Sequence, residues 1–262
     1  MAILSMREIL EKSITARSFS DFKALLDVND NTLMELYAAG LLPLNELTEG
    51  HLQTWIANQY EKRAHTEWMA LHKEWKGSDA SVIVLPAHHA LKRWAKHTDG
   101  ATAYCLPADA KVFLFLPIKN SEKVPIRTLL THEYHHVCRW EQLQRKGALF
   151  SLLERMVQEG LATKASEERG EARWRVDEMY PPLSKREKSL VQKQIDLKMD
   201  GFSEKSTVVM YGNGRKWPRL LGYRAGIQMV REYYIDHSWN IRKSFSISAG
   251  DILSHSSFNA QM

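Results

Sequence analysis

The stretch Leu129–Trp140, LLTHEYHHVCRW, places three histidines and one glutamate in five consecutive positions. Residues 132–136 satisfy the pattern His-Glu-x-x-His. Because residues four apart lie on one face of a helix, His132 and His136 can direct imidazole nitrogens at a single cation. Glu133 would then lie beside the ion without binding it, where its carboxylate could accept a proton from a water ligand. The stretch therefore predicts a metal-binding helix.

The residues around this motif decide between a metal site and a polar helix with solvent-facing histidines, because the pattern alone also arises by chance. An apolar strand pattern at residues 112–116 precedes the motif. Apolar side chains suited to packing lie within and around it, namely Ile126, Leu129, Leu130, Val137 and Trp140. A strand followed by such a helix is the setting in which metallopeptidases use the motif, so the context favours a metal site.

A catalytic zinc usually takes three protein ligands and a water, so a third ligand should lie downstream. The best candidate is Glu159 in ERMVQEGLATKAS. The chain between His136 and Glu159 is long enough for the first helix to end near Gly147 and for a second helix to return antiparallel to it. Small residues should keep that second helix slim enough to approach the first, namely Gly160, Ala162 and Ala165. The alternatives lack this neighbourhood and are expected to be solvated: Glu154, Glu167 and Glu168.

Helical periodicity dominates the first 76 residues and resumes after residue 124. Early helices are expected at REILEKSI, at SDFKALL with Ser20 as its cap, at DNTLMELYAAGLLP with a stop at Gly40, and as one long helix over TEGHLQTWIANQYEKRAHTEWMALHKEWKG. SVIVLPA, TDGATAYCLP and AKVFLFLPI read as strands, the last two joined by a turn near ADA, with a short helix through HHALKRWAKH. Later helices are expected at about 125–145, 148–168, 184–200 and 222–237.

These patterns predict an α+β fold that is mostly helical, with a small antiparallel or mixed sheet next to the motif helix. We expect a helical N-terminal segment at residues 1–77 and a catalytic domain at residues 78–262. If KVFLFLP formed an edge strand beside the motif helix, its free backbone groups could pair with an extended peptide.

Composition limits the kinds of partner and the cellular location that the sequence predicts for the protein. The formal net charge is +5, but the basic residues are dispersed and no nucleic-acid motif accompanies them. The two cysteines, Cys105 and Cys138, supply neither a thiolate zinc cluster nor a secreted disulfide framework. We find no signal peptide and no apolar run of membrane-spanning length. A cytoplasmic protein without nucleic-acid or membrane partners is expected.

Three blocks in order, HEYHHVCRW, VQEGLATKAS and WPRLLGYRAGIQMVREY, resemble the bacterial family of predicted zinc-dependent proteases of the YjaZ-like group. The resemblance covers roughly residues 81–258. It implies a zincin-like fold with a gluzincin-like site: His132, His136 and Glu159 as zinc ligands and Glu133 as catalytic base. Many relatives carry an acid one turn after the ligand glutamate, where this chain has Thr163, so another group would have to orient the ligand histidine.

Hydrolysis of an amide also needs a donor for the developing oxyanion. Tyr223 in LLGYRAG is the first candidate, because it lies in the third family-like block and its hydroxyl can donate a hydrogen bond. Arg224 could instead bind a substrate carboxylate or carbonyl, and His237 or Tyr211 could be the donor. Each of these side chains could equally serve as a structural anchor.

The sequence thus predicts a zinc metallopeptidase acting on a peptide or protein substrate. One alternative is a catalytically silent zincin-like binding or regulatory protein, although a silent descendant would have no need of Glu133 beside a complete ligand set. The other alternative is a helical protein that binds no metal. His135 is not expected to be a ligand: its side chain would either donate a hydrogen bond beside the metal site or lie on the far side of the helix. Cys138 should turn away from the shared face of the two ligand histidines.

Overall fold

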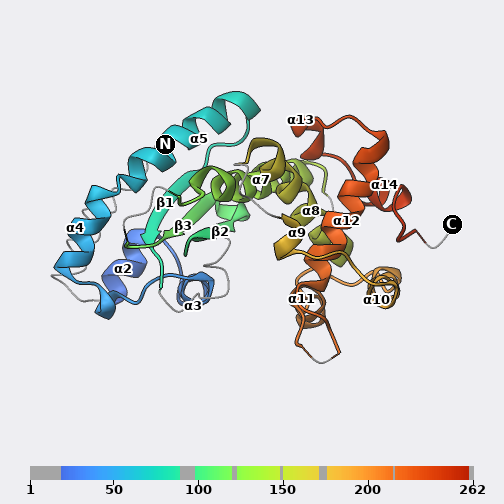
Figure 1. The fold of residues 1–262 in the computed structure, drawn as a ribbon, viewed down its shortest axis with the longest axis horizontal. Coiled ribbons are helices and arrows are strands. Elements are labelled where there is room, and N and C mark those ends of the chain that lie inside the picture. The colour runs from blue at the N-terminus through green and yellow to red at the C-terminus, as the bar shows by residue number, and fades with distance from the viewer. Residues whose placement is uncertain are drawn as a thin grey trace. The chain divides into compact units, whose positions relative to one another are not determined.

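A computed structural model describes residues 19–88, 98–119, 123–147, 150–170, 176–214 and 216–259. The chain forms two compact units, Met1–Val137 and Cys138–Met262, and the division falls within helix α7, Ile126–Arg145. Figure 1 shows that helices dominate the described residues and that three strands lie side by side in the first unit. The predicted class, a mostly helical α+β fold with a small mixed sheet, is confirmed.

The described part of the first unit begins with a series of helices: α2 (Phe19–Leu26), α3 (Asp30–Ala39), a short 3-10 helix (Leu44–Glu46), α4 (Glu49–Ala57) and α5 (Tyr60–Trp75). The Asn29 side chain caps α3 by accepting from the backbone N–H of Thr32, and α3 ends at Gly40 as predicted. The prediction for Ser20 is wrong, because α2 begins at Phe19 and Ser20 lies inside it. The helix expected at REILEKSI lies outside the described residues.

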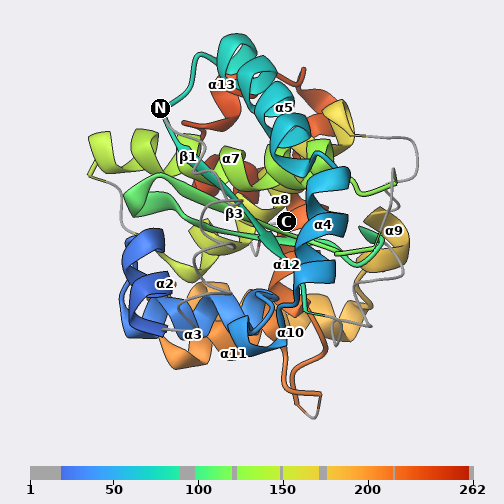
Figure 2. The same cartoon turned by 90° about the vertical axis from the view of Figure 1, so that its left-hand side faces the viewer.

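The single long helix predicted over residues 48–77 is wrong, because the chain bends between α4 and α5 (Figures 1 and 2). Gln59 adopts a left-handed conformation with φ 50°, and the Asn58 side chain donates to the Thr54 carbonyl at the end of α4. The ring of Trp55 then packs edge-on against Tyr60 at 5.0 Å. Neither glycine nor proline lies at this bend, so the sequence gives no sign of it.

The sheet contains β1 (Ser81–Pro86), β2 (Thr102–Leu106) and β3 (Lys111–Leu116) in the order β1-β3-β2. Strand β3 pairs in parallel with β1, with Ser81 opposite Lys111, and antiparallel with β2, with Thr102 opposite Phe115. The predicted hairpin is confirmed, and its turn is a 3-10 helix at Pro107–Asp109. The helix expected through HHALKRWAKH lies almost entirely outside the described residues.

The edge-strand hypothesis for KVFLFLP is wrong, because β3 is the central strand and both of its edges are paired. Residues 112–116 of β3 and 82–86 of β1 are buried throughout, whereas every residue of β2 is half-buried. A continuous apolar run fits a strand buried on both faces, and an extended peptide has no free edge to join there. Backbone pairing of a substrate with β3 is therefore excluded.

Helix α7 confirms the prediction for residues 125–145, and its first half is fixed to α5. The Arg127 guanidinium donates to the Glu67 carboxylate, with Nη2 and Oε1 3.0 Å apart. The Tyr134 ring stacks on Trp75 with centroids 5.4 Å apart, and its hydroxyl donates to the Ser78 carbonyl at 2.7 Å. Because α5 also contacts β1, these bonds tie the motif helix to the layer that carries the sheet.

The second unit contains α8 (Leu152–Arg169), α9 (Val176–Met179), α10 (Lys185–Asp196), α11 (Glu204–Tyr211), α12 (Leu221–Asp236), α13 (Ile241–Ser244) and α14 (Ala249–Ser254). Side-chain caps begin most of them, and Ser184 with Glu187 forms a capping box at α10. The three longest were predicted to within a few residues. The short helices α9, α11, α13 and α14 were not predicted, because two turns or fewer carry little periodicity.

Helices α8 and α12 cross at two glycines. A Cβ built on Gly226 would lie 1.7 Å from the backbone oxygen of Met156, and one built on Gly160 would lie 2.2 Å from the oxygen of Gly226. Gly160 was predicted to let α8 approach the motif helix, but the partner that it meets is α12. This close backbone approach requires the absence of both side chains.

Replacing Gly226 with alanine is expected to destabilise the protein by about 3 kcal/mol, because overpacking against rigid backbone cannot be relieved by a change of rotamer. Urea denaturation of the purified variant measures the change. Gly250→Ala is the matched control, since a Cβ there meets nothing closer than the Ser248 hydroxyl oxygen at 3.8 Å. Equal midpoints for the two variants would contradict the described crossing.

Candidate metal centre

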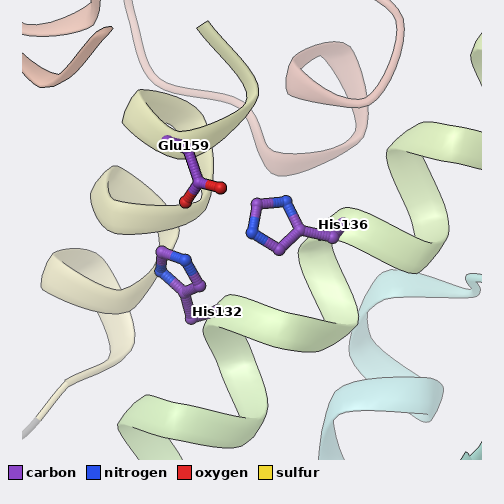
Figure 3. Close-up of side chains that lie close together, drawn as sticks. All are labelled: His132, His136 and Glu159. Carbon is purple, nitrogen blue, oxygen red and sulfur yellow. The ribbon is translucent and has the colours of Figure 1, made fainter. Parts of the chain in front are cut away.

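Three side chains that the sequence assigns to a metal lie together. His132, His136 and Glu159 each offer one ligand atom, and these atoms all lie within 4.8 Å of one another. Figure 3 shows the two imidazoles on one side of α7, with the Glu159 carboxylate of α8 close to both. The two ring centroids are 4.8 Å apart and the ring planes stand at 84°. The four-residue spacing thus brings the histidines together as predicted.

The remaining positions of the motif segment have other surroundings. His135 is fully buried and lies edge-on to Trp75, with ring centroids 6.3 Å apart. Cys138 is also buried, and neither residue belongs to the group of possible ligands. Glu133 is half-buried, and within the described ranges no hydrogen bond or ion pair engages its carboxylate. That carboxylate is therefore free to accept a proton.

The alternative acids on α8 are engaged elsewhere. Glu167 pairs with Arg231, and Glu168 pairs with Lys164 one turn away on the same helix. Glu154 was expected to be solvated, but it is 6% exposed and pairs with Arg139. Among the acids of α8, only Glu159 belongs to the group of possible ligands found in the described residues.

Arg139 links α7 to two later parts of the second unit and was not singled out from the sequence. Its Nε donates to Glu154 Oε1 at 2.8 Å, its Nη1 to the Ser244 carbonyl at 2.7 Å and its Nη2 to the Ile247 carbonyl at 2.9 Å. The side chain is completely buried. A buried arginine needs such partners, because an unpaired charge in the interior is costly. We call this arrangement the Arg139 clamp.

Tyr223 lies on α12, one turn before the crossing glycine Gly226. Burial raises the pKa of its hydroxyl well above the usual value, and the neighbouring Glu159 carboxylate raises the same pKa further. The hydroxyl therefore keeps its proton at every physiological pH. Tyr223 is thus a neutral hydrogen-bond donor within electrostatic reach of Glu159, as the hypothesis of an oxyanion donor requires.

The other candidates for binding a substrate oxygen have structural partners, as Tyr223 itself does, since its hydroxyl donates a long hydrogen bond to the Tyr211 hydroxyl at 3.5 Å. Arg224 donates from Nη1 to the Glu187 carboxylate at 2.7 Å and from Nε to the Pro181 carbonyl at 2.7 Å. The His237 ring stacks on Tyr233 with centroids 3.9 Å apart. The suggestion that Arg224 grips a substrate is not supported, because its guanidinium already joins α12 to α10 and the segment before it.

Thr163 is buried one turn beyond Glu159 on α8. A threonine hydroxyl replaces the acid that the resemblance leads one to expect, so the position carries no negative charge. Thr163 can still donate or accept a hydrogen bond, but it cannot make a carboxylate–histidine contact.

Comparison with known proteins gives a family match over most of the chain. The family described as "Predicted Zn-dependent protease (DUF2268)" matches residues 60–254. The match begins in α5, before the Ser81 at which the resemblance in the sequence begins. A Bacillus subtilis (strain 168) protein called "Uncharacterized protein YjaZ" is 30% identical over 193 residues, which cover 70% of this chain and 69% of that protein. No solved structure matches. Among the described residues, no helix is both long and apolar enough to cross a membrane.

Proposed function

This chain belongs to the DUF2268 family of predicted Zn-dependent proteases, and from that premise we propose that it hydrolyses peptide bonds as a zinc metallopeptidase. The proposed ligands are His132, His136 and Glu159, and the proposed general base is Glu133. The observation that carries the proposal is the grouping of Glu159 with the two histidines of the His-Glu-x-x-His motif. The substrate would be a peptide or protein.

The donor set fits zinc. Two imidazole nitrogens and one carboxylate oxygen form a known ligand set of catalytic zinc sites, which leave one coordination position open. Ligand atoms about 2.1 Å from a tetrahedral zinc ion lie about 3.4 Å apart. The three ligand atoms lie within 4.8 Å of one another, so rotations of the side chains would have to bring them closer around an ion.

A zinc ion in this position would supply an acidified water and a Lewis acid for the substrate carbonyl. Glu133 takes the proton from the attacking water and delivers it to the leaving amine. Its adjacency to His132 in the sequence would keep its carboxylate beside a bound ion without making it a ligand.

Tyr223 is the proposed oxyanion donor. Its protonated hydroxyl can donate a hydrogen bond to the carbonyl oxygen as negative charge develops there. The close crossing of α8 and α12 supports this role. Tyr223 lies one turn before Gly226 on α12, and Glu159 lies next to Gly160 on α8. The donor is therefore held by backbone packing and not by a mobile loop.

Zinc content tests the proposal. Purified protein should contain about one zinc per chain and hydrolyse unstructured peptides, and a chelator should abolish both properties until zinc is restored. Glu159→Ala should bind zinc at least about tenfold more weakly, because two histidines alone do not complete the site. Elemental analysis and competition with a chromogenic chelator provide the measurements.

Glu168→Ala is the matched control, because it removes an exposed acid from the same helix. It should leave zinc content and hydrolysis unchanged. Zinc bound equally well by Glu159→Ala would contradict the ligand assignment. Stoichiometric zinc without hydrolysis of any peptide would favour the silent binding protein.

A further inference from the structure

Arg155 lies on α8 one turn before Glu159, so both side chains leave the same face of that helix. In the described part of the chain, its guanidinium makes no ion pair with an acid. Arg139 and Arg224, which also belong to the second unit, each bind a glutamate. Arg155 therefore presents a positive charge that pairs with no carboxylate of the described residues.

Neutral groups hold this guanidinium in place. Nη1 donates to the Gly201 carbonyl at 2.9 Å and to the Thr207 hydroxyl at 3.3 Å, and Nη2 donates to the Tyr211 hydroxyl at 3.4 Å. The Gly201 backbone is itself fixed, because its N–H donates to the Phe150 carbonyl at 2.9 Å. A guanidinium has five N–H donors, so donors remain for a ligand. The group is oriented before any ligand arrives.

Two tyrosines connect Arg155 with Glu159. The Arg155 guanidinium carbon lies 5.4 Å from the Tyr211 ring centre, and the Tyr211 and Tyr223 rings are 5.5 Å apart. Tyr223 lies one turn before Gly226 on α12, and Gly226 meets Gly160, the residue next to Glu159, where the two helices cross. Tyr211 is 45% exposed, so solutes can reach the row at this side chain, and Arg155 and Tyr223 on either side of it are half-buried.

The length of the row fits a short piece of peptide. An extended chain rises about 3.3 Å per residue, so each of the two separations corresponds to less than two residues. A carbonyl at Tyr223 and a carboxylate at Arg155 would be about three residues apart at most. Arginine is suited to the second position, because its planar fork binds a carboxylate through two parallel hydrogen bonds.

We propose that Arg155 binds a carboxylate of the peptide substrate within about three residues of the scissile bond. The carboxylate is either the free C-terminus of the peptide or an aspartate or glutamate side chain. The inference rests on the proposed peptidase function, which it deepens by naming an acidic substrate class. It assigns to Arg155 the role that Arg224 cannot fill.

Binding to the zinc-loaded Glu133→Gln protein tests the inference without turnover. The probes are dansyl-Ala-Ala-Phe-Ala-Ala as free acid, the same peptide as C-terminal amide, and the amide with Asp as last residue. The free acid or the Asp amide should bind at least about tenfold more tightly than the neutral amide, as expected for a charge-assisted pair. Comparing the free acid with the Asp amide shows whether Arg155 prefers a terminal carboxylate or a side-chain carboxylate.

Adding Arg155→Gln should remove this preference, whereas adding Arg145→Gln should not. Arg145 is an exposed arginine paired with Glu141 on α7, so its loss changes the net charge equally. If Arg155→Gln does not fold, Arg155→Lys replaces it: the charge stays but the planar fork is lost, and the preference should fall several-fold. Equal affinity for all three probes, or a preference that survives both Arg155 variants, would overturn the inference.

Hydrolysis by the unmodified protein separates the two proposals. Cleavage of the acid and the neutral amide with equal kcat/KM would support the peptidase function and contradict the role proposed for Arg155. The opposite result is a binding preference that depends on Arg155 while the unmodified protein cleaves no probe. That result would support the carboxylate site and contradict the peptidase function.

Discussion

Glu133→Gln is expected to lower kcat for peptide hydrolysis by about 10²–10⁴-fold, the usual contribution of a general acid–base residue, while zinc content stays unchanged. Glutamine has the same shape as glutamate but cannot accept the proton of the attacking water. Glu133 is half-buried and, within the described ranges, has no hydrogen-bond or ion-pair partner to lose. The variant should therefore fold normally, so the loss can be assigned to chemistry.

Single-turnover hydrolysis of a fluorogenic peptide, with zinc measured on the same preparation, provides the test. Glu141→Gln is the matched control, because that glutamate lies on the same helix and pairs only with the exposed Arg145 among the described residues. Wild-type turnover by Glu133→Gln would remove Glu133 as the base. Lost zinc in the same variant would instead indicate that Glu133 is a ligand.

Arg139→Met is expected to destabilise the protein by about 3–5 kcal/mol, because it leaves the Glu154 carboxylate buried without its partner. The Ser244 and Ile247 carbonyls would lose their donors in the same step. For a protein of this size each kcal/mol corresponds to about 2–4 °C in Tm. Differential scanning calorimetry should therefore show one of the largest shifts of any single variant.

Arg145→Gln is the comparison for the clamp, since an exposed pair contributes only about 0–1 kcal/mol. The double variant Arg139→Met with Glu154→Leu should recover part of the loss, because replacing both members of a buried pair with apolar groups is often nearly neutral. A double variant as unstable as the single one would show that the two carbonyl contacts, and not the ion pair, dominate the clamp.

The elements that could be predicted, and the group of possible metal ligands, share one property: their signal in the sequence is local. The four-residue spacing of His132 and His136 follows from helix geometry, and the strand and hairpin of residues 102–116 follow from apolar runs around a turn. Glu159 was singled out because small residues lie beside it, and it does lie with the two histidines. The helix that Gly160 allows to approach is α12, however, and not the motif helix that the sequence predicted.

The features that were missed depend on which side chains meet across the fold. Nothing in the sequence pairs Arg139 with Glu154, or shows that Arg155 has no acidic partner among the described residues, because both facts depend on helix packing. The central position of β3 was missed because an apolar run does not reveal its neighbours. The boundary proposed near residue 77 stays a prediction, and the family match already includes α5.

The crossing at Gly226 affects how the results of a mutational screen of this protein should be interpreted. A Cβ there would push α12 away from α8, and Tyr223 lies on the turn that would move. Activity would fall although position 226 contributes no reacting group. A screen scored by turnover alone would therefore rank Gly226 beside Glu133, and only the abundance of folded protein for each variant would tell the two kinds of position apart.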